Sequence, residues 1–331
     1  MRSFSLVILF VYGLIPLASS ANDTPAVRPP RTRSPSASTA PEPTKSDVAY
    51  GPHAKNVLHF WKAKSDTPTP LVLYIHGGGW MGGNRLSGLA GVLPEYLKSG
   101  ISVASVEYRF IPEAIADDVK PPVKAPLHDA ARALQFIRSN ATDWNIDKQK
   151  IAASGGSAGA CSSLWLAFHD DLANPKSTDP IARESTRLMC AAVSGAQTTL
   201  DPHQMKEWTP NSNYGSHAFG IFKEVNGKNV RDFEGFLAKR EQLLPWIAEY
   251  SPYALVTADD PPVFLFYNAP PALGQDQRDP THTSNFGVKL QEKLASVNVP
   301  CDLVYPGAED VKHATVVQYL IAKLTSAKVE Q

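Results

Sequence analysis

Short, continuous apolar runs recur along the chain from about residue 62 onward, and they are rich in branched side chains. They lack the clean polar alternation of a half-exposed strand, so they predict strands that are covered on both faces. Six such runs read LVLYIH (71–76), ISVASVEY (101–108), IAAS (151–154), LMCAAVSG (188–195), VFLFYN (263–268) and CDLVY (301–305). The pattern predicts a buried central sheet.

Helical periodicity appears between several of these runs. LHDAARALQFIRSNA (127–141) and SNFGVKLQEKLAS (284–296) both place apolar residues near one helical face. Strands that alternate with helices at this spacing predict an α/β fold with a mostly parallel, doubly wound sheet.

One long segment, about residues 198–250, interrupts this alternation. It contains no obvious buried strand, and a compact domain rarely leaves so long a connection without structure. Its aromatic residues are Trp208, Tyr214, Phe219, Phe222, Phe233, Phe236 and Trp246. This content favours a helical, lid-like insertion over a site, with a surface decoration as the alternative.

The N-terminus has the features of an export signal. A short cationic start precedes the apolar stretch LVILFVYGLIPLA, and small residues suit cleavage after Ala21. The stretch is shorter than the ~20 residues that span a bilayer, so residues 1–21 are interpreted as a signal peptide, with a retained anchor as the alternative. Residues 22–47 are rich in Pro, Ser and Thr and are expected to form a disordered linker before a domain at 48–331.

The composition narrows the function classes. Lys plus Arg and Asp plus Glu both count 32, so no global field attracts nucleic acid or anionic membranes. Cys161, Cys190 and Cys301 each lie in an apolar run and are expected to be buried thiols. No metal-binding motif, P-loop or dinucleotide fingerprint is present, and no cofactor is expected.

The stretch IAASGGSAGACSSLWLAFH places Ser157 in a G-x-S-x-G motif, Gly155-Gly156-Ser157-Ala158-Gly159. A predicted strand precedes the motif and an apolar helical stretch follows it, which is the setting of a nucleophile elbow. In such a turn the serine hydroxyl projects above the sheet edge at a helix N-terminus, where developing negative charge is favoured. Ser157 is therefore the candidate nucleophile.

A second motif, His76-Gly77-Gly78-Gly79-Trp80, follows the predicted strand LVLYIH. Consecutive glycines let backbone N–H groups turn toward a substrate oxygen, where such donors stabilise the oxyanion of a tetrahedral intermediate. A flexible glycine turn is the structural alternative. The order of the two motifs along the chain favours the catalytic interpretation.

With these motifs, the chain resembles α/β-hydrolase carboxylesterases, the group that includes hormone-sensitive-lipase-like and bacterial feruloyl- or acetylxylan-esterase-like enzymes. The resemblance runs from about Val57 to Leu324 and includes PLVLYIHGGGW, SVEYRFIPEA and SPYALVTADDPPVFLFYN. It implies that the amides of Gly78, Gly79 and Ala158 form an oxyanion hole. It also implies structural roles for Tyr108, Arg109 and Asp129.

The third functional group should be a histidine on the loop after the last strand, because this fold orders its triad as Ser, acid, His. The only histidine beyond CDLVY is His313, which makes it the leading candidate for the base. Its loop, PGAEDVKHA, is longer than the family pattern and lacks the aromatic residue expected after the histidine. His203, His217 and His282 are further candidates.

The acid loop also departs from the family, because APPALGQDQRDPTHTSNFG stands where the pattern usually reads H-G-x-x-D. The stretch from Asp279 to Leu294 aligns with the family without a gap, which assigns the acid to Asp279. Asp276 requires a small insertion and is the alternative.

These residues together predict an exported serine esterase that hydrolyses carboxylic esters through an acyl-enzyme intermediate. A small-molecule ester or an acylated polysaccharide is the expected substrate, while the oligomeric state is not predicted. A peptidase is a weaker alternative. The rival from another class is a non-catalytic binding protein that retains the hydrolase fold.

Overall fold

A computed structural model describes residues 40–326, all within one compact unit. The predicted signal peptide and residues 22–39 of the predicted linker lie outside the described residues. In the described part of the chain, no helix is both long and apolar enough to cross a membrane.

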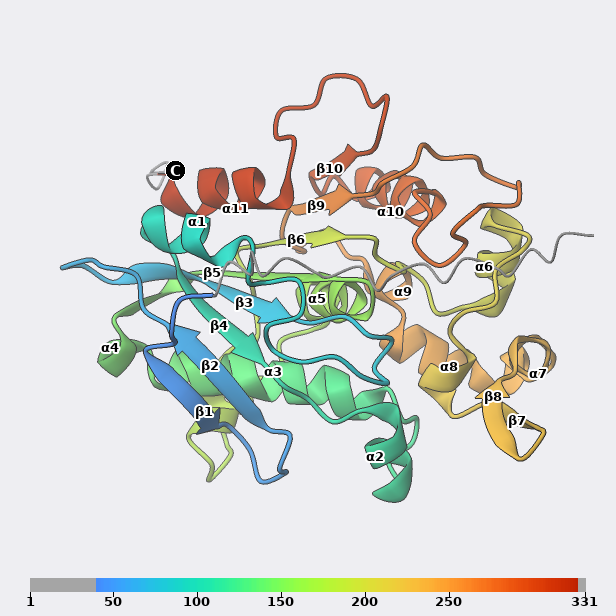
Figure 1. Cartoon of the computed structure of the whole chain (residues 1–331), viewed down its shortest axis with the longest axis horizontal. Helices are drawn as coiled ribbons and strands as arrows, with labels where there is room; N and C mark the ends of the chain where they lie inside the picture. Colours follow the sequence, from blue (N-terminus) through green and yellow to red (C-terminus); the bar gives the residue numbers. More distant parts are fainter. Residues whose placement is uncertain (1–39, 327–331) are drawn as a thin grey trace, which may run out of the picture. The chain divides into compact units, whose positions relative to one another are not determined.

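The core of the fold is an eight-stranded sheet in the order β1-β2-β4-β3-β5-β6-β9-β10 (Figure 1). The strands are β1 (Lys45–Ala49), β2 (Val57–Trp61), β3 (Thr69–Ile75), β4 (Ser102–Val106), β5 (Ile146–Gly156), β6 (Cys190–Ser194), β9 (Val263–Phe266) and β10 (Cys301–Val304). From β4 to β10 all neighbouring strands are parallel, while β1 and β2 run antiparallel to their neighbours. The predicted mostly parallel α/β fold is confirmed.

Helices cover both faces of this sheet (Figure 1). The main helices are α1 (Leu93–Lys98), α2 (Ile111–Ala116), α3 (Lys124–Ser139), α4 (Ala141–Trp144), α5 (Ala158–Phe168), α9 (Pro252–Leu255), α10 (Asn285–Ser296) and α11 (Val316–Thr325), with a short 3₁₀ turn η1 (Ile181–Arg183). Residues of α3, α5 and α10 belong to one buried cluster, and residues of α1 and α11 belong to the other.

Strand β3 shows why its sequence has no polar alternation. Leu71, Leu73 and Ile75 pack into the larger cluster, whereas Val72 and Tyr74 pack into the smaller one. Because successive side chains of a strand point to opposite faces, a strand between two helical layers needs apolar residues at every position. The sequence pattern and the layered fold have the same physical cause.

Strands β1 and β2 were not predicted from the sequence. Because β1 begins at Lys45, the folded domain starts earlier than the predicted end of the linker. Strand β1 pairs with β2, the Trp61 indole N–H donates to the carbonyl of Pro41 (2.7 Å), and the amide of Lys62 donates to Thr44 Oγ1 (2.9 Å). The predicted linker boundary at residue 47 is therefore wrong, because residues from Pro41 onward belong to the folded domain. A partly exposed edge strand is stabilised by its backbone hydrogen bonds and needs little apolar sequence.

The insertion at residues 198–250 has its own secondary structure. It comprises α6 (Pro202–Trp208), η2 (Ser216–Phe219), the hairpin β7 (Phe222–Val225) and β8 (Lys228–Arg231), α7 (Phe233–Ala238) and α8 (Arg240–Tyr250). A bidentate ion pair joins its two ends, since the Arg240 guanidinium donates to both carboxylate oxygens of Asp201 at 2.8 and 2.7 Å. Asp201 is itself buried and caps α6.

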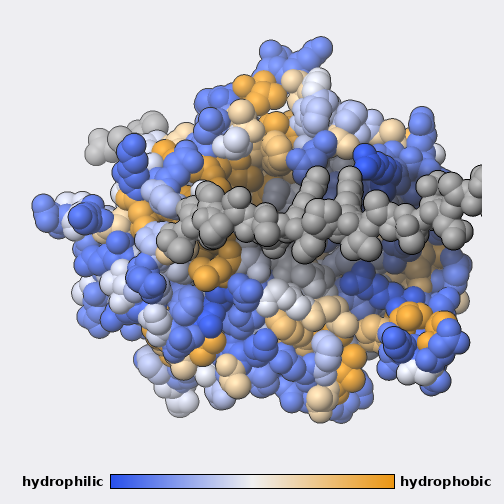
Figure 2. Space-filling model, viewed as in Figure 1, coloured by the Kyte–Doolittle hydropathy of each residue, from blue (hydrophilic) through white to orange (hydrophobic). Residues whose placement is uncertain are grey.

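The aromatic residues of the insertion are mostly buried. Trp208, Tyr214 and Phe236 are 4%, 3% and 0% exposed and belong to the larger hydrophobic cluster. The surface seen in Figure 2 is predominantly hydrophilic, with apolar residues scattered among polar ones. The aromatic content of the segment therefore reflects core packing.

Candidate active site

Ser157 lies between the end of β5 and the start of α5, as the nucleophile-elbow motif predicts. Its backbone adopts φ 54° and ψ −123°, a combination that is strained for a residue with a side chain. Its amide donates to the carbonyl of Ser194 (3.0 Å), which anchors the turn to the neighbouring strand β6. The elbow thus presents the Ser157 hydroxyl at the carboxyl edge of the sheet.

The small residues around Ser157 are required by close backbone contacts. A Cβ on Gly155 would lie 2.3 Å from the carbonyl oxygen of Ile75, and a Cβ on Gly159 would lie 2.0 Å from the same atom. Both distances are far below van der Waals contact, and backbone atoms cannot move aside as the end of a side chain can. The motif therefore needs glycine at these positions because strand β3 passes directly next to the elbow.

The histidine in contact with Ser157 is His282. Its Nε2 lies 2.9 Å from Ser157 Oγ, and its Nδ1 lies 2.8 Å from Asp279 Oδ2. Because a carboxylate only accepts hydrogen bonds, Nδ1 carries the proton and Nε2 presents its lone pair to the serine hydroxyl. Asp279 and His282 belong to one loop, between β9 and α10.

The same loop holds the Asp279 carboxylate in place. The backbone amides of Thr281 and His282 both donate to Asp279 Oδ1 at 3.2 Å. Partial desolvation raises the pKa of Asp279, but the hydrogen bonds from His282 and Thr281 outweigh it and hold the pKa below its usual value. Asp279 therefore stays ionised beside the imidazole.

The prediction that His313 lies beside the nucleophile is wrong. His313 Nδ1 lies 3.5 Å from Asp302 Oδ2 on β10, and its ring packs edge-on against Tyr319 at 5.4 Å between centroids. These contacts place it at a separate 180 Å³ cavity formed by β10 and residues 309–313. The long loop after β10 turns back onto its own strand, so it does not reach Ser157.

Asp279, and not Asp276, meets the histidine. Asp276 is exposed, and its backbone carbonyl accepts a hydrogen bond from the Gln277 side chain (3.2 Å). The family register that selected Asp279 therefore agrees with the position of this carboxylate. The sequence did contain a signal for this histidine. His282 lies only three residues after the predicted acid Asp279, close enough for the two side chains to meet within one loop.

The glycine loop after β3 lies directly against the elbow. A Cβ on Gly77 would lie 2.7 Å from the carbonyl oxygen of Gly156 and 3.4 Å from Ser157 Cβ. Gly78 and Gly79 have φ values of +113° and +63°, which glycine adopts without strain. Within residues 40–326, no backbone carbonyl accepts a hydrogen bond from the amides of Gly78, Gly79 or Ala158. These three donors are available to a bound oxygen atom.

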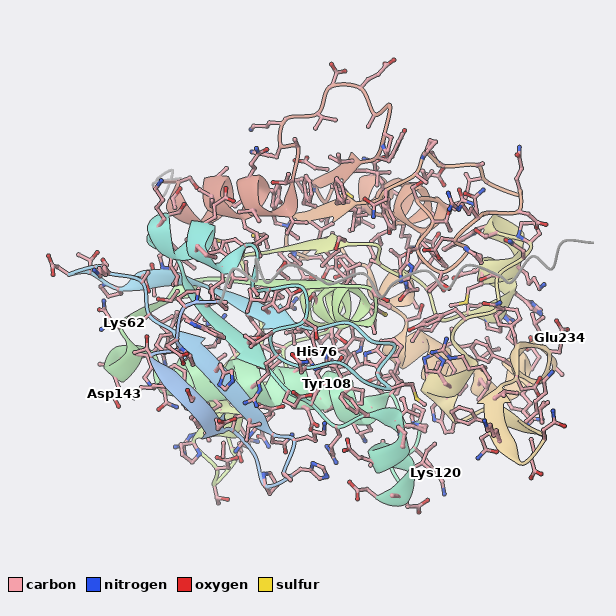
Figure 3. The ribbon with its side chains drawn as sticks, in the orientation of Figure 1. Lys62, His76, Tyr108, Lys120, Asp143 and Glu234 are labelled. Atoms are coloured by element: carbon pink, nitrogen blue, oxygen red, sulfur yellow. The ribbon has the colours of Figure 1, made fainter. Side chains whose placement is uncertain are left out.

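Side chains on several elements fix the shape of this loop. The Tyr108 hydroxyl donates to the carbonyl of His76 (2.7 Å), and the two rings stack with their centroids 4.4 Å apart. Both residues are labelled in Figure 3. The indole N–H of Trp80 donates to Ser162 Oγ on α5 (2.9 Å), and His217 Nε2 contacts the carbonyl of Gly79 (3.0 Å). These contacts anchor the loop at both ends.

The partly buried Arg109 and the buried Asp129 form an ion pair. The Arg109 guanidinium donates to both carboxylate oxygens of Asp129 at 3.0 and 2.7 Å, and this hydrogen bonding raises the pKa of Arg109. Asp129 is 4% exposed and also accepts from the Arg109 amide (3.0 Å). This geometry matches the structural role implied for the pair.

A cavity of 570 Å³ opens at Ser157. Its lining residues are Tyr74, Gly77, Gly78, Gly83, Ser87, Gly88, Gly156, Ser157, Ser194, Gly195, Asn268, Asp279 and His282. The side chains of His282 and Asp279 are 39% and 62% exposed, so the site is open to solvent. Among these lining residues none comes from 198–250, so the predicted lid does not cover the cavity.

Two further predictions concern metals and thiols. Among residues 40–326, no group of three or more His, Cys, Asp or Glu side chains could hold a metal ion. All three cysteines are free thiols, with Cys161 and Cys190 buried and Cys301 partly exposed.

A serine elbow after the central strand of a mostly parallel sheet, with a histidine and a carboxylate at hydrogen-bond distance, defines an α/β-hydrolase. Residues 59–273, more than half of the chain, match the BD-FAE family model. The chain belongs to the BD-FAE family, within the α/β-hydrolase carboxylesterases.

Several curated relatives with detectable sequence similarity are esterases. The versiconal hemiacetal acetate esterase of Dothistroma septosporum is 34% identical over 150 residues, which are 44% of this chain and 41% of that protein. Gut esterase 1 of Caenorhabditis elegans is 33% identical over 119 residues, 34% of this chain and 20% of that protein. The chain therefore spans less than half the length of these relatives.

Solved structures with the same fold extend over most of the chain. A truncated carbohydrate esterase from gut microbiota covers 85% of this chain and 96% of its own, with a TM-score of 0.61 at 16% identity. The acetyl ester-xyloside bifunctional hydrolase of Caldicellulosiruptor lactoaceticus covers 75% of this chain and 77% of its own, with a TM-score of 0.55 at 23% identity. At these identities the comparison shows the shared fold.

Proposed function

We propose that this protein is an exported serine esterase in which Ser157, His282 and Asp279 form the catalytic triad. The observation that carries the proposal is the continuous hydrogen-bond chain from Ser157 Oγ through the imidazole to the Asp279 carboxylate. Serine is a weak nucleophile until a neutral imidazole accepts its proton, and this arrangement provides that base.

In the first half of the reaction, His282 Nε2 accepts the hydroxyl proton while Ser157 Oγ bonds to the ester carbonyl carbon. The carbonyl oxygen becomes an oxyanion, and the amides of Gly78, Gly79 and Ala158 are the proposed donors to it. As the tetrahedral intermediate collapses, the bond to the alcohol oxygen breaks and His282 returns its proton to that oxygen. The acyl group then remains on Ser157.

In the second half, water takes the place of the alcohol. His282 Nε2 accepts a proton from the water as its oxygen bonds to the acyl carbon, and the proton passes to Ser157 Oγ when the acyl-enzyme bond breaks. Asp279 stabilises the imidazolium in both halves without being protonated itself. The products are a carboxylic acid and the regenerated serine.

Acyl groups on a polysaccharide are the substrate class that the site fits best. Both His282 and Asp279 are exposed, so an ester attached to a large molecule can reach Ser157 without complete enclosure. Hydroxyl and amide side chains of Ser87, Ser194 and Asn268 line the cavity and suit a sugar. Structural neighbours described as a carbohydrate esterase and an acetyl ester-xyloside hydrolase are consistent with this substrate class.

The experiment uses a serine-directed fluorophosphonate probe on residues 22–331, compared with Ser157→Ala. Intact mass spectrometry reports the adduct, and hydrolysis of p-nitrophenyl acetate and of an acetylated xylan reports turnover. We expect one adduct and acetate release from both substrates, each lost in Ser157→Ala.

The outcomes separate the competing functions. A folded wild type that neither reacts nor turns over would favour the non-catalytic binding protein. Turnover of p-nitrophenyl acetate without release from the polysaccharide would retain the esterase and reject the substrate class.

A further inference from the structure

The loop that carries the proposed base and acid is largely exposed. It joins β9 to α10 (Figure 1), and residues 273–276 within it are exposed. The turn at residues 279–282 is closed on itself, because the amides of Thr281 and His282 donate to the Asp279 carboxylate. These internal bonds orient the imidazole within the turn, but they do not fix the turn relative to Ser157.

Gln197 ties this turn to the sheet. Its side chain is fully buried and follows the end of β6 by three residues. The Gln197 Nε2 donates to the carbonyl of Thr281 (2.7 Å) and to the carbonyl of Gly195 (3.1 Å). Because a side-chain amide carries two N–H groups, both bonds form at the same time. The amide thus links the residue before His282 to the backbone at the end of β6.

The carbonyl of Gly195 belongs to the stretch of backbone that also holds the nucleophile. Gly195 directly follows Ser194, whose carbonyl accepts the hydrogen bond from the Ser157 amide (3.0 Å). A Cβ on Gly195 would lie 3.3 Å from His282 Cδ2, so the imidazole packs against this residue. One buried amide therefore connects the backbone that anchors the serine elbow to the turn that carries the base.

Few other hydrogen bonds join this turn to the rest of the protein. Within residues 40–326, the segment 279–282 makes two hydrogen bonds to residues outside it, one from Gln197 to Thr281 and one between His282 and Ser157. The second of these is the reacting contact itself. Without the Gln197 amide, the turn would be hydrogen-bonded to the sheet only through the contact whose geometry catalysis requires.

We propose that Gln197 is a positioning residue that holds His282 Nε2 at hydrogen-bond distance from Ser157 Oγ. Gln197 does not line the cavity at Ser157, so it acts through the turn and not on the substrate. The inference rests on the esterase function proposed above and adds a residue to that site. A displacement of the base by about 1 Å is enough to slow such a reaction by up to about a hundredfold.

The test uses two variants of Gln197 and a matched control. Gln197→Met keeps nearly the same length and volume but has no N–H group to donate, whereas Gln197→Asn keeps the amide on a shorter stem. The control is Gln135→Met on α3. Gln135 is also buried, at 6% exposed, and its Nε2 donates to the backbone carbonyl of Glu184 (2.9 Å). The control therefore removes the same kind of hydrogen bond from a residue that does not contact the turn.

The readouts are kcat and KM for p-nitrophenyl acetate, with urea unfolding measured in parallel. We expect Gln197→Met to lower kcat about thirtyfold and Gln197→Asn about fivefold, with KM within about twofold of the wild type. His282 acts in both halves of the reaction, so kcat falls whichever half is limiting. Gln135→Met should lower the unfolding midpoint while kcat stays within about twofold. A glutamine with a merely structural role would behave like this control.

A folded Gln197→Met with the kcat of the wild type would overturn the positioning role and leave the esterase intact. If that variant does not fold, Gln197→Asn is judged by the same criterion. A wild type that does not hydrolyse the ester would contradict the proposed function instead. The positioning role is then decided by hydrogen–deuterium exchange in peptides that cover residues 279–283. Faster exchange in the folded Gln197 variant than in Gln135→Met supports the role, and equal exchange overturns it.

Discussion

At the residue scale, the proposed base and the proposed acid of this site come from one loop. Asp279 and His282 are three residues apart, and the amides of the same turn bind the carboxylate. The imidazole is therefore oriented by contacts within its own loop and does not depend on the glycine loop for its orientation. Only Ser157 has to be brought to this pair by the fold.

Substituting His282 and His313 in turn should show which of the two histidines is the catalytic base. We expect His282→Ala to lower kcat/KM for p-nitrophenyl acetate by about a thousandfold or more, because Ser157 loses its base. His313→Ala should stay within about threefold of the wild type, since His313 contacts Asp302 and Tyr319. Steady-state kinetics on folded variants checks this prediction. A large loss in His313→Ala with little loss in His282→Ala would assign the base to His313.

Between about pH 5 and 8, kcat/KM should rise along a single ascending limb. The imidazole of His282 must be neutral to accept the Ser157 proton, so protonating it removes the base. Asp279, whose pKa lies below its usual value, is already ionised throughout this range and adds no second limb. A rate that is flat across the range while acylation is limiting would contradict the assignment.

Asp279→Asn should reduce kcat by about 10³-fold or more, because the amide no longer selects the productive imidazole tautomer. Asp276→Asn is the matched control, as its side chain is exposed and lies three residues earlier in the same loop. Comparable losses in both variants would indicate that the loop, and not the Asp279 carboxylate, is being disturbed.

At the element scale, the tight crossing of β3 and the elbow limits what the sequence tolerates. We expect Gly159→Ala to destabilise the fold by about 2–3 kcal/mol, because its Cβ would lie 2.0 Å from the Ile75 carbonyl. Gly91→Ala, where no atom lies within 4 Å, should change stability by less than about 0.5 kcal/mol. Urea unfolding compares the two, and equal midpoints would refute the steric argument.

The elements themselves were largely predictable wherever burial dictates the sequence. β3 and β9 are apolar at nearly every position because helices cover both faces, and a continuous apolar run identifies such strands. The edge strand β1, KSDVA, is mostly exposed and has no such run, and its pairing with β2 depends on backbone hydrogen bonds that any sequence can form. Residues 41–47 were therefore mistaken for a linker.

At the scale of the whole molecule, the described domain accounts for residues 40–326 and leaves export as a prediction from the N-terminal sequence. Expression of the full chain in a secreting host should release a protein whose N-terminus is Asn22. Ala21→Arg should block processing, because signal peptidase requires a small residue there. Intact mass and N-terminal sequencing check both, and an uncleaved, membrane-associated wild type would favour the retained anchor.

The sequence by itself determined the six parallel strands of the sheet, the elbow and the candidate nucleophile, because each depends on local constraints. Apolar runs follow from two-sided burial, and the glycines around Ser157 follow from backbone contacts at a tight turn. The acid could be aligned because the helix after its loop keeps the family register.

The tertiary structure decided which histidine meets Ser157 and that the insertion contacts the glycine loop. Chain order placed the base after the last strand, yet the loop of His313 turns back to β10 while His282 spans 125 residues of sequence to reach Ser157. The contact between His217 and Gly79 is equally non-local. Side-chain positions of this kind depend on how loops pack across the sheet edge, and no periodicity along the chain encodes them.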